Sequence, residues 1–246
     1  MATKITPKKT RQPAKKATVS LRSKISRFML KLILWFIGIS LFFVVLFKFI
    51  PVVFTPLMVI RAIENKVAGK EIIFSHDWEP IDKLSMNLQK AVIASEDGNF
   101  LTHNGFDFTA MQKAYKSNER GRRIKGGSTI SQQTAKNVFL WQGRSYFRKG
   151  LEAYFTVLIE MIWGKERIME VYLNSIEMGD GVYGAQAATE HWYRKGATSL
   201  TPIQAAGIAA ILPNPRKYKA TSSSSYINNR KGKIVRVMKQ LGKIKY

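Results

Sequence analysis

The most constraining feature of the sequence is an uninterrupted apolar stretch near its N-terminus. Residues 32–47 read LILWFIGISLFFVVLF and carry no charge, and flanking apolar residues extend the stretch to 28–50. A helix rises about 1.5 Å per residue, so roughly 20 residues cross a hydrocarbon core of about 30 Å. Lys31 and Lys48 lie near the two ends, where their long side chains can reach the headgroups. We therefore expect one transmembrane helix over residues 28–50.

Two other interpretations of this stretch are a buried core helix and a cleavable signal peptide. The stretch is apolar on every side, longer than the usual apolar region of a signal peptide, and followed by no small-x-small cleavage site. These features favour a retained anchor. Ten basic residues and no acidic residue occur in residues 1–31, whereas only Lys48 and Arg61 follow closely behind the stretch. By the positive-inside rule, the N-terminus is expected in the cytoplasm and the chain from about residue 55 outside it.

The overall charge is strongly positive, with 40 Lys and Arg against 16 Asp and Glu and a formal net charge of +24. Such a charge suggests nucleic acid, acidic phospholipid or a phosphorylated substrate as the partner. The expected topology argues against nucleic acid. We expect the basic arm at residues 1–27 to bind anionic lipid of the inner leaflet. The chain contains no cysteine, which excludes disulfides, thiolate metal sites and cysteine nucleophiles.

The rest of the chain is expected to be mainly α-helical. Apolar residues recur three and four positions apart over residues 80–95, 151–163 and 166–173, which predicts helices there. The sequence TPIQ at residues 201–204 matches a capping box with proline at the first helical position, and the helix that it begins should stop before Pro213. Few runs alternate as strands do. We expect an α-rich single domain with a small irregular lobe.

Two polar strings contain candidate functional residues. The first, EDGNFLTHNG at residues 96–105, begins where the helix over 80–95 is expected to end. A carboxylate there is suited to general base catalysis, but it is also typical of a solvated or capping residue. The second, GGSTISQQTAKN at residues 126–137, places glycines, hydroxyls and Lys136 around a helix start, which suits an anion. It is not a Walker P-loop, and neither string identifies a function alone.

Taken together, the strings resemble the peptidoglycan glycosyltransferases, the polymerising module of bifunctional penicillin-binding proteins and of monofunctional biosynthetic transglycosylases. The family motif E-D-x-x-F-x-x-H-x-G is matched in full at residues 96–105, and G-x-S-T-I-x-Q-Q is matched at 126–133. The motif R-K-x-x-E is matched at 148–152. With a fourth motif at residues 165–174, four motifs in the family's order over about eighty residues make the resemblance highly specific.

Two further motifs differ in quality. The motif K-x-x-I-L-E-x-Y-L-N is matched at residues 165–174, with Met169 in place of leucine, whereas R-R-x-x-x-V-L is matched poorly at residues 230–235. The resemblance covers roughly residues 75 to 240. We expect no transpeptidase domain, because the chain ends at Tyr246, and the monofunctional members are therefore the close match.

The resemblance implies a lysozyme-like, mainly α-helical glycosyltransferase domain with a small membrane-proximal lobe, preceded by one transmembrane helix. It divides the chain into a basic cytoplasmic arm (1–27), a transmembrane helix (28–50), a membrane-proximal connector (51–74) and the glycosyltransferase domain (75–246). The apolar run at residues 52–60 suits a segment packed at the membrane surface, where a lipid tail enters.

The implied reaction polymerises lipid II. The 4-hydroxyl of one disaccharide attacks the anomeric carbon of a glycan carried on undecaprenyl diphosphate, with inversion. This attack needs a base for the hydroxyl proton and positive charge for the departing diphosphate, but no strong general acid.

The resemblance also assigns residues. Glu96 is the base, and Glu152 supports it by orienting the donor or by helping to hold a divalent metal, Mg²⁺ or Mn²⁺, against the diphosphate. No organic cofactor is implied. The cations expected at the diphosphate are Lys136, Arg144, Arg148 and Lys149. The other residues expected to contact the substrate are Asp97, Phe100, Ser128, Thr129, Gln132, Gln133 and Asn137.

Simpler roles are open for several residues. Lys149 and Glu152 lie three apart on an expected helix, where an exposed ion pair is worth a few tenths of a kcal/mol. We expect His103 to be a structural hydrogen-bonding residue rather than a proton shuttle. Residues 120–125 are either a solvated loop or a flap over the acceptor channel. Packing or capping roles are expected for Glu160, Glu170 and Asn174.

Two other function classes are a glycan-cleaving enzyme on the same scaffold and a non-catalytic membrane scaffold. A polymer hydrolase does not require the cations of a diphosphate site, and the pair of glutamates speaks against a scaffold. The expected partners are lipid II, the lipid-linked glycan, the bilayer, and cell-division proteins or other peptidoglycan synthases. We expect a single-pass protein of the bacterial cytoplasmic (inner) membrane with its catalytic domain on the periplasmic face.

Overall fold

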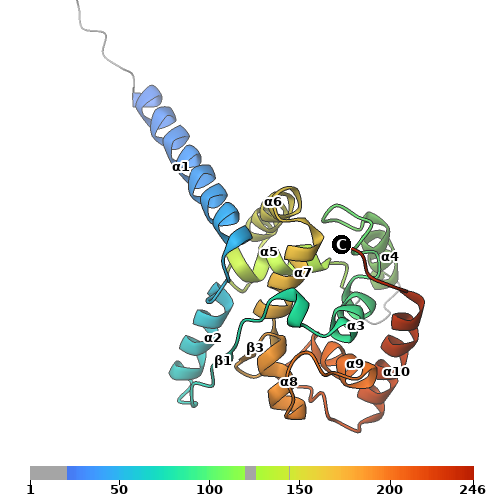
Figure 1. Ribbon diagram of the computed structural model, residues 1–246. Coiled ribbons are helices and arrows are strands. Elements are labelled where there is room, and N and C mark those ends of the chain that lie inside the picture. Colours follow the sequence, from blue (N-terminus) through green and yellow to red (C-terminus); the bar gives the residue numbers. More distant parts are fainter. Residues whose placement is uncertain (1–20, 120–125, 144) are drawn as a thin grey trace, which may run out of the picture. The chain divides into compact units, whose positions relative to one another are not determined.

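The computed structural model describes residues 21–119, 126–143 and 145–246 (Figure 1). Its chain divides into two compact units, Met1–Phe42 and Phe43–Tyr246. The described part of the first unit belongs to one helix, α1 (Leu21–Phe49), whose last seven residues lie in the second unit. The basic arm expected at residues 1–27 falls largely outside the described residues.

Helix α1 confirms the helix expected over residues 28–50 and begins seven residues earlier. Within the described chain, it is the one helix long and apolar enough to cross a membrane, with a mean hydropathy of 2.6. Only 11% of its most apolar window is buried, and Trp35 is 69% exposed. This exposure contradicts a buried core helix, because a helix that is apolar all round requires an apolar environment. The helix suggests a membrane anchor.

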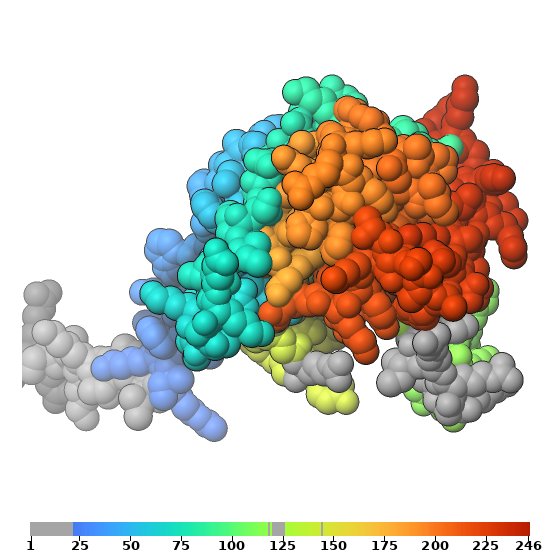
Figure 2. All heavy atoms as spheres, turned by 90° about the horizontal axis from the view of Figure 1, so that it is seen from below, coloured from blue at the N-terminus to red at the C-terminus, as the bar shows by residue number. Residues whose placement is uncertain are grey.

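The second unit is a helical domain with one large core and a small separate cluster of Leu57, Met58 and Tyr183. Helix α9 (Pro202–Ile211) is buried on nearly all sides and packs between α3 (Met86–Glu96) and α10 (Ser225–Gln240). Helix α5 (Ile130–Phe139) packs against α6 and α7. In Figure 2 the C-terminal part of the chain, coloured orange to red, forms one continuous area of the surface. The remaining helices are α2 (Pro56–Val67), the 3₁₀ helix η1 (Ile81–Lys83), α4 (Phe108–Glu119), α6 (Tyr146–Ile162), α7 (Gly164–Ser175) and α8 (Ala185–Tyr193).

A small sheet has the strand order β1-β3-β2, where β1 is parallel and β2 antiparallel to β3. The turn between β2 and β3 requires Gly181, which has φ +71°, and an added Cβ would lie 2.2 Å from the carbonyl oxygen of Ile73. The strands are β1 (Ser75–His76), β2 (Glu177–Gly179) and β3 (Val182–Tyr183). These few short strands fit the expected α-rich class.

The helix predicted over residues 80–95 is wrong in its first part. A 3₁₀ turn is followed by extended backbone at Leu84 (φ −92°, ψ 131°), and α3 begins at Met86. The N–H of Ser85 donates to the carbonyl oxygen of Ala197 at 3.0 Å, a tertiary contact that local periodicity does not contain. The end of the predicted helix at Ser95 is accurate within one residue, since α3 ends at Glu96.

The capping box predicted at residues 201–204 is confirmed. The Thr201 hydroxyl accepts from the N–H of Gln204, whose side chain accepts in return from the N–H of Thr201. The helix ends at Ile211, before Pro213 as expected.

The C-terminal end of α1 is fixed to the rest of the helical domain by hydrogen bonds. The carbonyl oxygen of Val44 accepts from Trp163 Nε1 at 2.7 Å. The Arg167 guanidinium donates to the carbonyl oxygens of Phe47, at 2.8 and 3.1 Å, and Ile50, at 2.5 Å. The carbonyl oxygen of Phe47 is among the last four of α1, which have no N–H partner within the helix. The contacts fix where the chain enters the connector.

Candidate functional site

Glu96 is the last residue of α3, and two side chains hold its carboxylate. Ser95 Oγ donates to Oε1 at 2.9 Å, and Gln133 Nε2, from α5, donates to Oε2 at 3.3 Å. Burial raises the pKa of Glu96 above its ordinary value, while the two hydrogen bonds and the charge of Arg230 oppose that rise. A carboxylate that gains proton affinity in this way is suited to act as a base.

Arg230, from α10, reaches Glu96 through Ser95. Its Nη2 donates to Ser95 Oγ at 3.1 Å, so the guanidinium orients the hydroxyl that holds the carboxylate. Sequence reasoning missed Ser95 and gave the poorly matched motif at residues 230–235 no role. The basic pair of that motif was the available signal, but its position beside Glu96 depends on the packing of α10 on α3.

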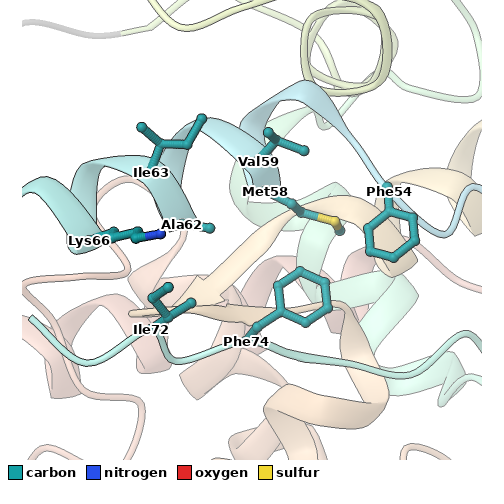
Figure 3. A pocket seen from close by; sticks show the side chains of 8 residues that line it. All are labelled: Phe54, Met58, Val59, Ala62, Ile63, Lys66, Ile72 and Phe74. Atoms are coloured by element: carbon teal, nitrogen blue, oxygen red, sulfur yellow. The ribbon is translucent and has the colours of Figure 1, made fainter.

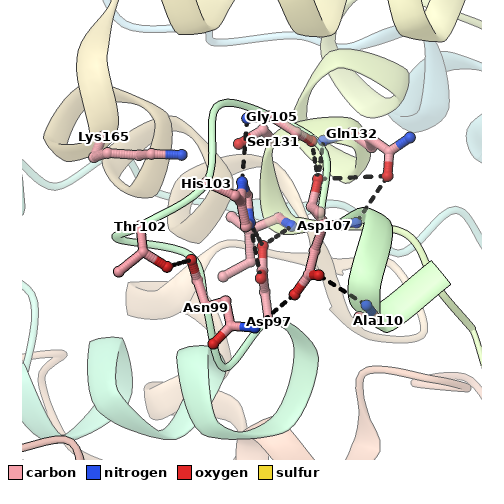
Figure 4. Close-up of polar contacts among 12 residues, drawn as sticks. Asp97, Asn99, Thr102, His103, Gly105, Asp107, Ala110, Ser131, Gln132 and Lys165 are labelled. Carbon is pink, nitrogen blue, oxygen red and sulfur yellow. Dashed lines mark hydrogen bonds and ion pairs between the residues drawn. The ribbon is translucent and has the colours of Figure 1, made fainter. Parts of the chain in front are cut away.

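Asp97 and His103 join the first polar string to the start of α5 (Figure 4). His103 Nε2 lies 3.0 Å from both oxygens of Asp97, and the N–H of Ile130 donates to Asp97 Oδ2 at 2.9 Å. The N–H of Gly105 donates to His103 Nδ1 at 3.1 Å, so Nε2 carries the proton that His103 donates to Asp97. This arrangement agrees with the structural role expected of His103.

The same string also fixes the start of α4. Asp107 Oδ1 accepts from the N–H of Ala110 at 2.8 Å, and Oδ2 accepts from Asn99 Nδ2 at 2.7 Å. These hydrogen bonds lower the pKa of Asp107, with the bond from Ala110 as the largest cause. The flap proposed for residues 120–125, beyond α4, lies outside the described residues.

Several predicted substrate contacts have structural partners. Thr129 and Gln132 form a capping box at the start of α5, which sequence reasoning did not recognise, and the Thr129 hydroxyl also donates to the carbonyl oxygen of Gly105 at 2.6 Å. Phe100 is fully buried, with the Lys165 amine 4.7 Å from its ring centre. Asp97 is buried as well. These positions fit structural roles, and substrate contact by these residues stays a prediction.

Gln133 is the residue of α5 that contacts Glu96. Besides its bond to Glu96, its Oε1 accepts from the hydroxyl of Tyr172, on α7, at 3.2 Å. This second contact orients the amide so that its NH₂ group points at Glu96. Ser128 is exposed and Asn137 is buried in the described structure.

Glu152, on α6, is buried and paired with two cations. Arg148 Nη1 donates to Oε2 at 3.1 Å, and the Lys149 amine donates to Oε1. The ion pair expected from spacing therefore exists. Its Lys149 side chain is 45% accessible, as expected of an exposed pair, but only 4% of the Glu152 side chain is accessible. The packing of α5 on α6 covers it. For the buried pair of Arg148 and Glu152, removal of one partner costs about 3–5 kcal/mol, far more than for a surface pair.

Lys136, near the end of α5, adds a third cation to this cluster. Burial is the main cause that lowers its pKa, and the charges of Arg148 and Lys149 lower it further while Glu152 raises it. A hollow of about 400 Å³ beside the cluster is lined by Ser145, Tyr146, Arg148 and Lys149. Arg144, the fourth predicted cation, lies outside the described residues.

Helix α5 connects the two glutamates. Gln133 and Lys136 lie three residues apart, so they share one helix face with Cβ atoms about 5–6 Å apart. Gln133 donates a hydrogen bond to Glu96, and the charge of Glu152 raises the pKa of Lys136. Through Gln133 and Lys136, α5 therefore joins the partly buried carboxylate of Glu96 to the charged cluster of Lys136, Arg148, Lys149 and Glu152.

A protein-family model described as Transglycosylase matches residues 65–239. The chain belongs to the transglycosylase family. A protein named biosynthetic peptidoglycan transglycosylase from Caulobacter vibrioides (strain ATCC 19089 / CIP 103742 / CB 15) is 58% identical over 78% of this chain and 81% of its own length.

Two further relatives carry the same name. One, from Pseudomonas syringae pv. syringae (strain B728a), is 52% identical over 90% of this chain and 94% of its own length. Another, from Bacteroides thetaiotaomicron, is 50% identical over 87% of each chain. The match of the transglycosylase model begins at residue 65, so it takes in the end of α2 and extends beyond the domain boundary expected at residue 75.

The residues of this transglycosylase do not form a metal site in the described structure. No group of three or more His, Cys, Asp or Glu side chains gathers among the described residues. Both oxygens of Glu152 are paired with Arg148 and Lys149, whose charges would repel a divalent cation. We therefore derive no catalytic step through a metal, and the predicted Mg²⁺ or Mn²⁺ remains to be tested.

Proposed function

We propose that this peptidoglycan glycosyltransferase polymerises lipid II into uncross-linked glycan strands, with Glu96 as the base. The observation that carries the proposal is the position of Glu96, where burial increases its proton affinity and α5 links it to the cluster of Lys136, Arg148, Lys149 and Glu152. The family match and the names of the relatives support the reaction class.

The proposed reaction is a direct displacement at the donor anomeric carbon. The Glu96 carboxylate accepts the proton of the acceptor 4-hydroxyl while that oxygen forms a bond to the donor anomeric carbon. The bond from that carbon to the diphosphate oxygen breaks, which inverts the carbon and releases undecaprenyl diphosphate. The bonds from Ser95 and Gln133 orient the carboxylate before the proton arrives.

The departing diphosphate is proposed to meet the cation cluster. Lys136, Arg148 and Lys149 outnumber the one carboxylate among them, so the cluster attracts an anion. Glu152 holds Arg148 and Lys149 in place, which gives it the supporting role. A polymer hydrolase has no diphosphate to bind and no use for such a cluster.

We also propose that α1 holds the protein in the bacterial cytoplasmic membrane, with the N-terminus inside and the catalytic domain on the periplasmic face. Support comes from the apolar character of α1 and the ten basic residues in residues 1–31. Cell-division proteins or other peptidoglycan synthases are proposed as partners.

The direct test is incubation of the purified full chain with lipid II. We expect glycan polymer and free undecaprenyl diphosphate, separated by gel electrophoresis and thin-layer chromatography. Cleavage of preformed strands without polymer formation would instead indicate a hydrolase. Parallel reactions with Mg²⁺, Mn²⁺ and a chelator test the divalent-metal prediction.

Removing the Ser95 hydroxyl should shift the pH dependence. In Ser95→Ala the ionised carboxylate of Glu96 loses a hydrogen bond, so its pKa should rise further. The base is active when deprotonated, and the acidic limb of kcat/KM against pH should therefore move to higher pH. Unchanged activity at high pH and reduced activity at low pH are expected. An acidic limb at the wild-type position would contradict this role of Ser95.

A further inference from the structure

The hydrogen bonds to the Glu96 side chain come from a small part of the described structure. An apolar groove between α2 and the chain that leads into β1 contains one charged side chain, Lys66, and none of its lining residues bonds to Glu96 (Figure 3). Among the described residues, the donors to Glu96 are Ser95 and Gln133. A side chain that orients the carboxylate through hydrogen bonds must therefore act through one of these two residues.

Tyr172, on α7, reaches Gln133 from the protein interior. Its side chain is fully buried, and its hydroxyl donates to Gln133 Oε1 at 3.2 Å. Gln133 Nε2 in turn donates to Glu96 Oε2 at 3.3 Å, so one amide joins the hydroxyl to the carboxylate. Tyr172 is the tyrosine of the motif matched at residues 165–174.

The chemistry of the three groups fixes the direction of both hydrogen bonds. An ionised carboxylate only accepts, so Gln133 must turn its NH₂ group to Glu96 and its carbonyl oxygen to Tyr172. Burial is the main cause that raises the pKa of Tyr172 well above its ordinary value, and the negative charges of Glu96 and Asp97 raise it further. The hydroxyl therefore keeps its proton, and remains a donor, while Glu96 is ionised.

Helix α7 holds Tyr172 in a fixed position. The neighbouring side chains of Met169 and Leu173 are fully buried, and α7 packs against α5. Near the end of α7, Asn174 Nδ2 donates to the carbonyl oxygen of Glu79 at 2.8 Å, and Asn174 Oδ1 accepts from the N–H of Glu79 at 2.9 Å. A side chain on such a helix is positioned more precisely than one on a loop.

The hydroxyl of Tyr172 is not explained by packing. Phenylalanine has the same ring and no buried polar group that needs a partner, so packing alone would favour it at this position. The bond to Gln133 therefore accounts for the hydroxyl. Because Tyr172 is fully buried, its side chain does not touch the substrate, and its role is that of a positioning residue.

We propose that Tyr172 positions the catalytic base, because its hydroxyl holds the Gln133 amide with the NH₂ group directed at the Glu96 carboxylate. The proposal rests on the proposed function of Glu96 as the base. Without the hydroxyl, the amide can turn away, which leaves the ionised carboxylate less stabilised and less well oriented for the acceptor hydroxyl.

The pKa of Glu96 is sensitive to this contact. Burial is the largest cause acting on that pKa and raises it, whereas the bond from Gln133 lowers it. Helix α9, which packs on α3, carries no charged residue. Loss of the Tyr172 hydroxyl should therefore raise the pKa of Glu96 by weakening the Gln133 bond. The other groups that act on it are Ser95 and Arg230, on α10, which lower it, and Asp97, which raises it.

Tyr172→Phe removes the hydroxyl and keeps the ring. In the full chain we expect kcat for lipid II polymerisation to fall by about 2- to 10-fold, the effect of one net hydrogen bond, with KM near the wild-type value. The acidic limb of kcat/KM should move to higher pH. The matched control is Tyr246→Phe, since the Tyr246 hydroxyl also donates to a glutamine of α3, Gln89 Oε1, at 2.7 Å. Its rates and pH profile should equal those of the wild type.

The pKa of Glu96 is also measurable without substrate. The full chain is labelled with ¹³C at its glutamate carboxyl groups and titrated by NMR, and the Glu96 signal is the one that Glu96→Gln removes. Tyr172→Phe should raise this pKa, but by less than Gln133→Met, which removes the bond itself. In the double variant, Tyr172→Phe should add nothing to Gln133→Met, because the hydroxyl then has no amide to hold.

Several results would overturn the role of Tyr172. One is an unchanged pKa of Glu96 in Tyr172→Phe, and another is a further shift in the Gln133→Met background, which would mean that the hydroxyl acts on Glu96 directly. Equal losses of activity in Tyr172→Phe and Tyr246→Phe would indicate a general loss of stability instead. A wild-type chain that makes no polymer overturns the proposed reaction together with this role, whereas wild-type polymerisation with an unchanged pKa in Tyr172→Phe overturns this role alone.

Discussion

Glu96→Gln is expected to lower kcat for lipid II polymerisation by at least ~100-fold, the smaller end of the range for a general base. Glutamine has nearly the same shape and still accepts a hydrogen bond from Ser95, but it cannot take the proton of the acceptor hydroxyl. Because the substitution preserves shape, KM should change little. The measurement is the initial rate of polymer formation at saturating lipid II, with folding checked by circular dichroism.

A matched control is Glu190→Gln, because Glu190 is an exposed glutamate on α8. Its rate should stay within about two-fold of the wild type, as is usual for surface substitutions. Polymer formation by Glu96→Gln at the wild-type level would remove the base assignment. A large rise in KM with kcat unchanged would instead give Glu96 a substrate-binding role.

Those helices could be predicted from the sequence whose position is determined by residues close together in the chain. The apolar stretch gave helix α1, and TPIQ at residues 201–204 gave the start of α9 because a capping box is formed by residues three apart. The start of α3 could not be predicted in this way. The bond from Ser85 to Ala197 joins residues far apart in sequence and keeps residue 84 extended.

In the site, too, contacts between neighbours in the sequence could be predicted and contacts between distant residues could not. The spacing of Lys149 and Glu152 predicts their contact, because residues three apart on a helix face one another. The burial of Glu152 depends on the helices that cover it and has no local signal. Arg230 and Ser95, which are joined by a hydrogen bond, lie 135 residues apart in the sequence. Only the family motif could therefore have indicated their contact.

The three cations near Glu152 have different roles. Arg148 and Lys149 both form salt bridges with Glu152. Lys136, the third cation of the cluster, forms no salt bridge with any residue that the structure describes. A cation without a carboxylate partner is the one most available to an anionic ligand. Lys136 is therefore the residue at which the proposed diphosphate site is best tested.

Lys136→Ala is expected to raise KM for lipid II by about 10- to 100-fold, since hydrogen bonds to charged groups contribute about 1.5–3 kcal/mol. Lys231→Ala is the matched control: Lys231, on α10, donates to the carbonyl oxygen of Ser222 at 3.3 Å and lies outside the cluster. Its KM should remain near the wild-type value. Equal effects of the two substitutions would mean that the diphosphate site is misplaced.

The arginine substitution at the same position gives a distinct pH signature. Burial lowers the pKa of Lys136, so its charge, which is present below that pKa, is lost on raising the pH sooner than from an ordinary lysine. In the wild type, lipid II binding should therefore weaken on the alkaline side. Lys136→Arg keeps its charge there because arginine does not deprotonate in proteins. Its alkaline limb of kcat/KM should move to higher pH, with KM near neutral pH closer to the wild type than that of Lys136→Ala; an unmoved limb would show that the charge at position 136 does not bind the diphosphate.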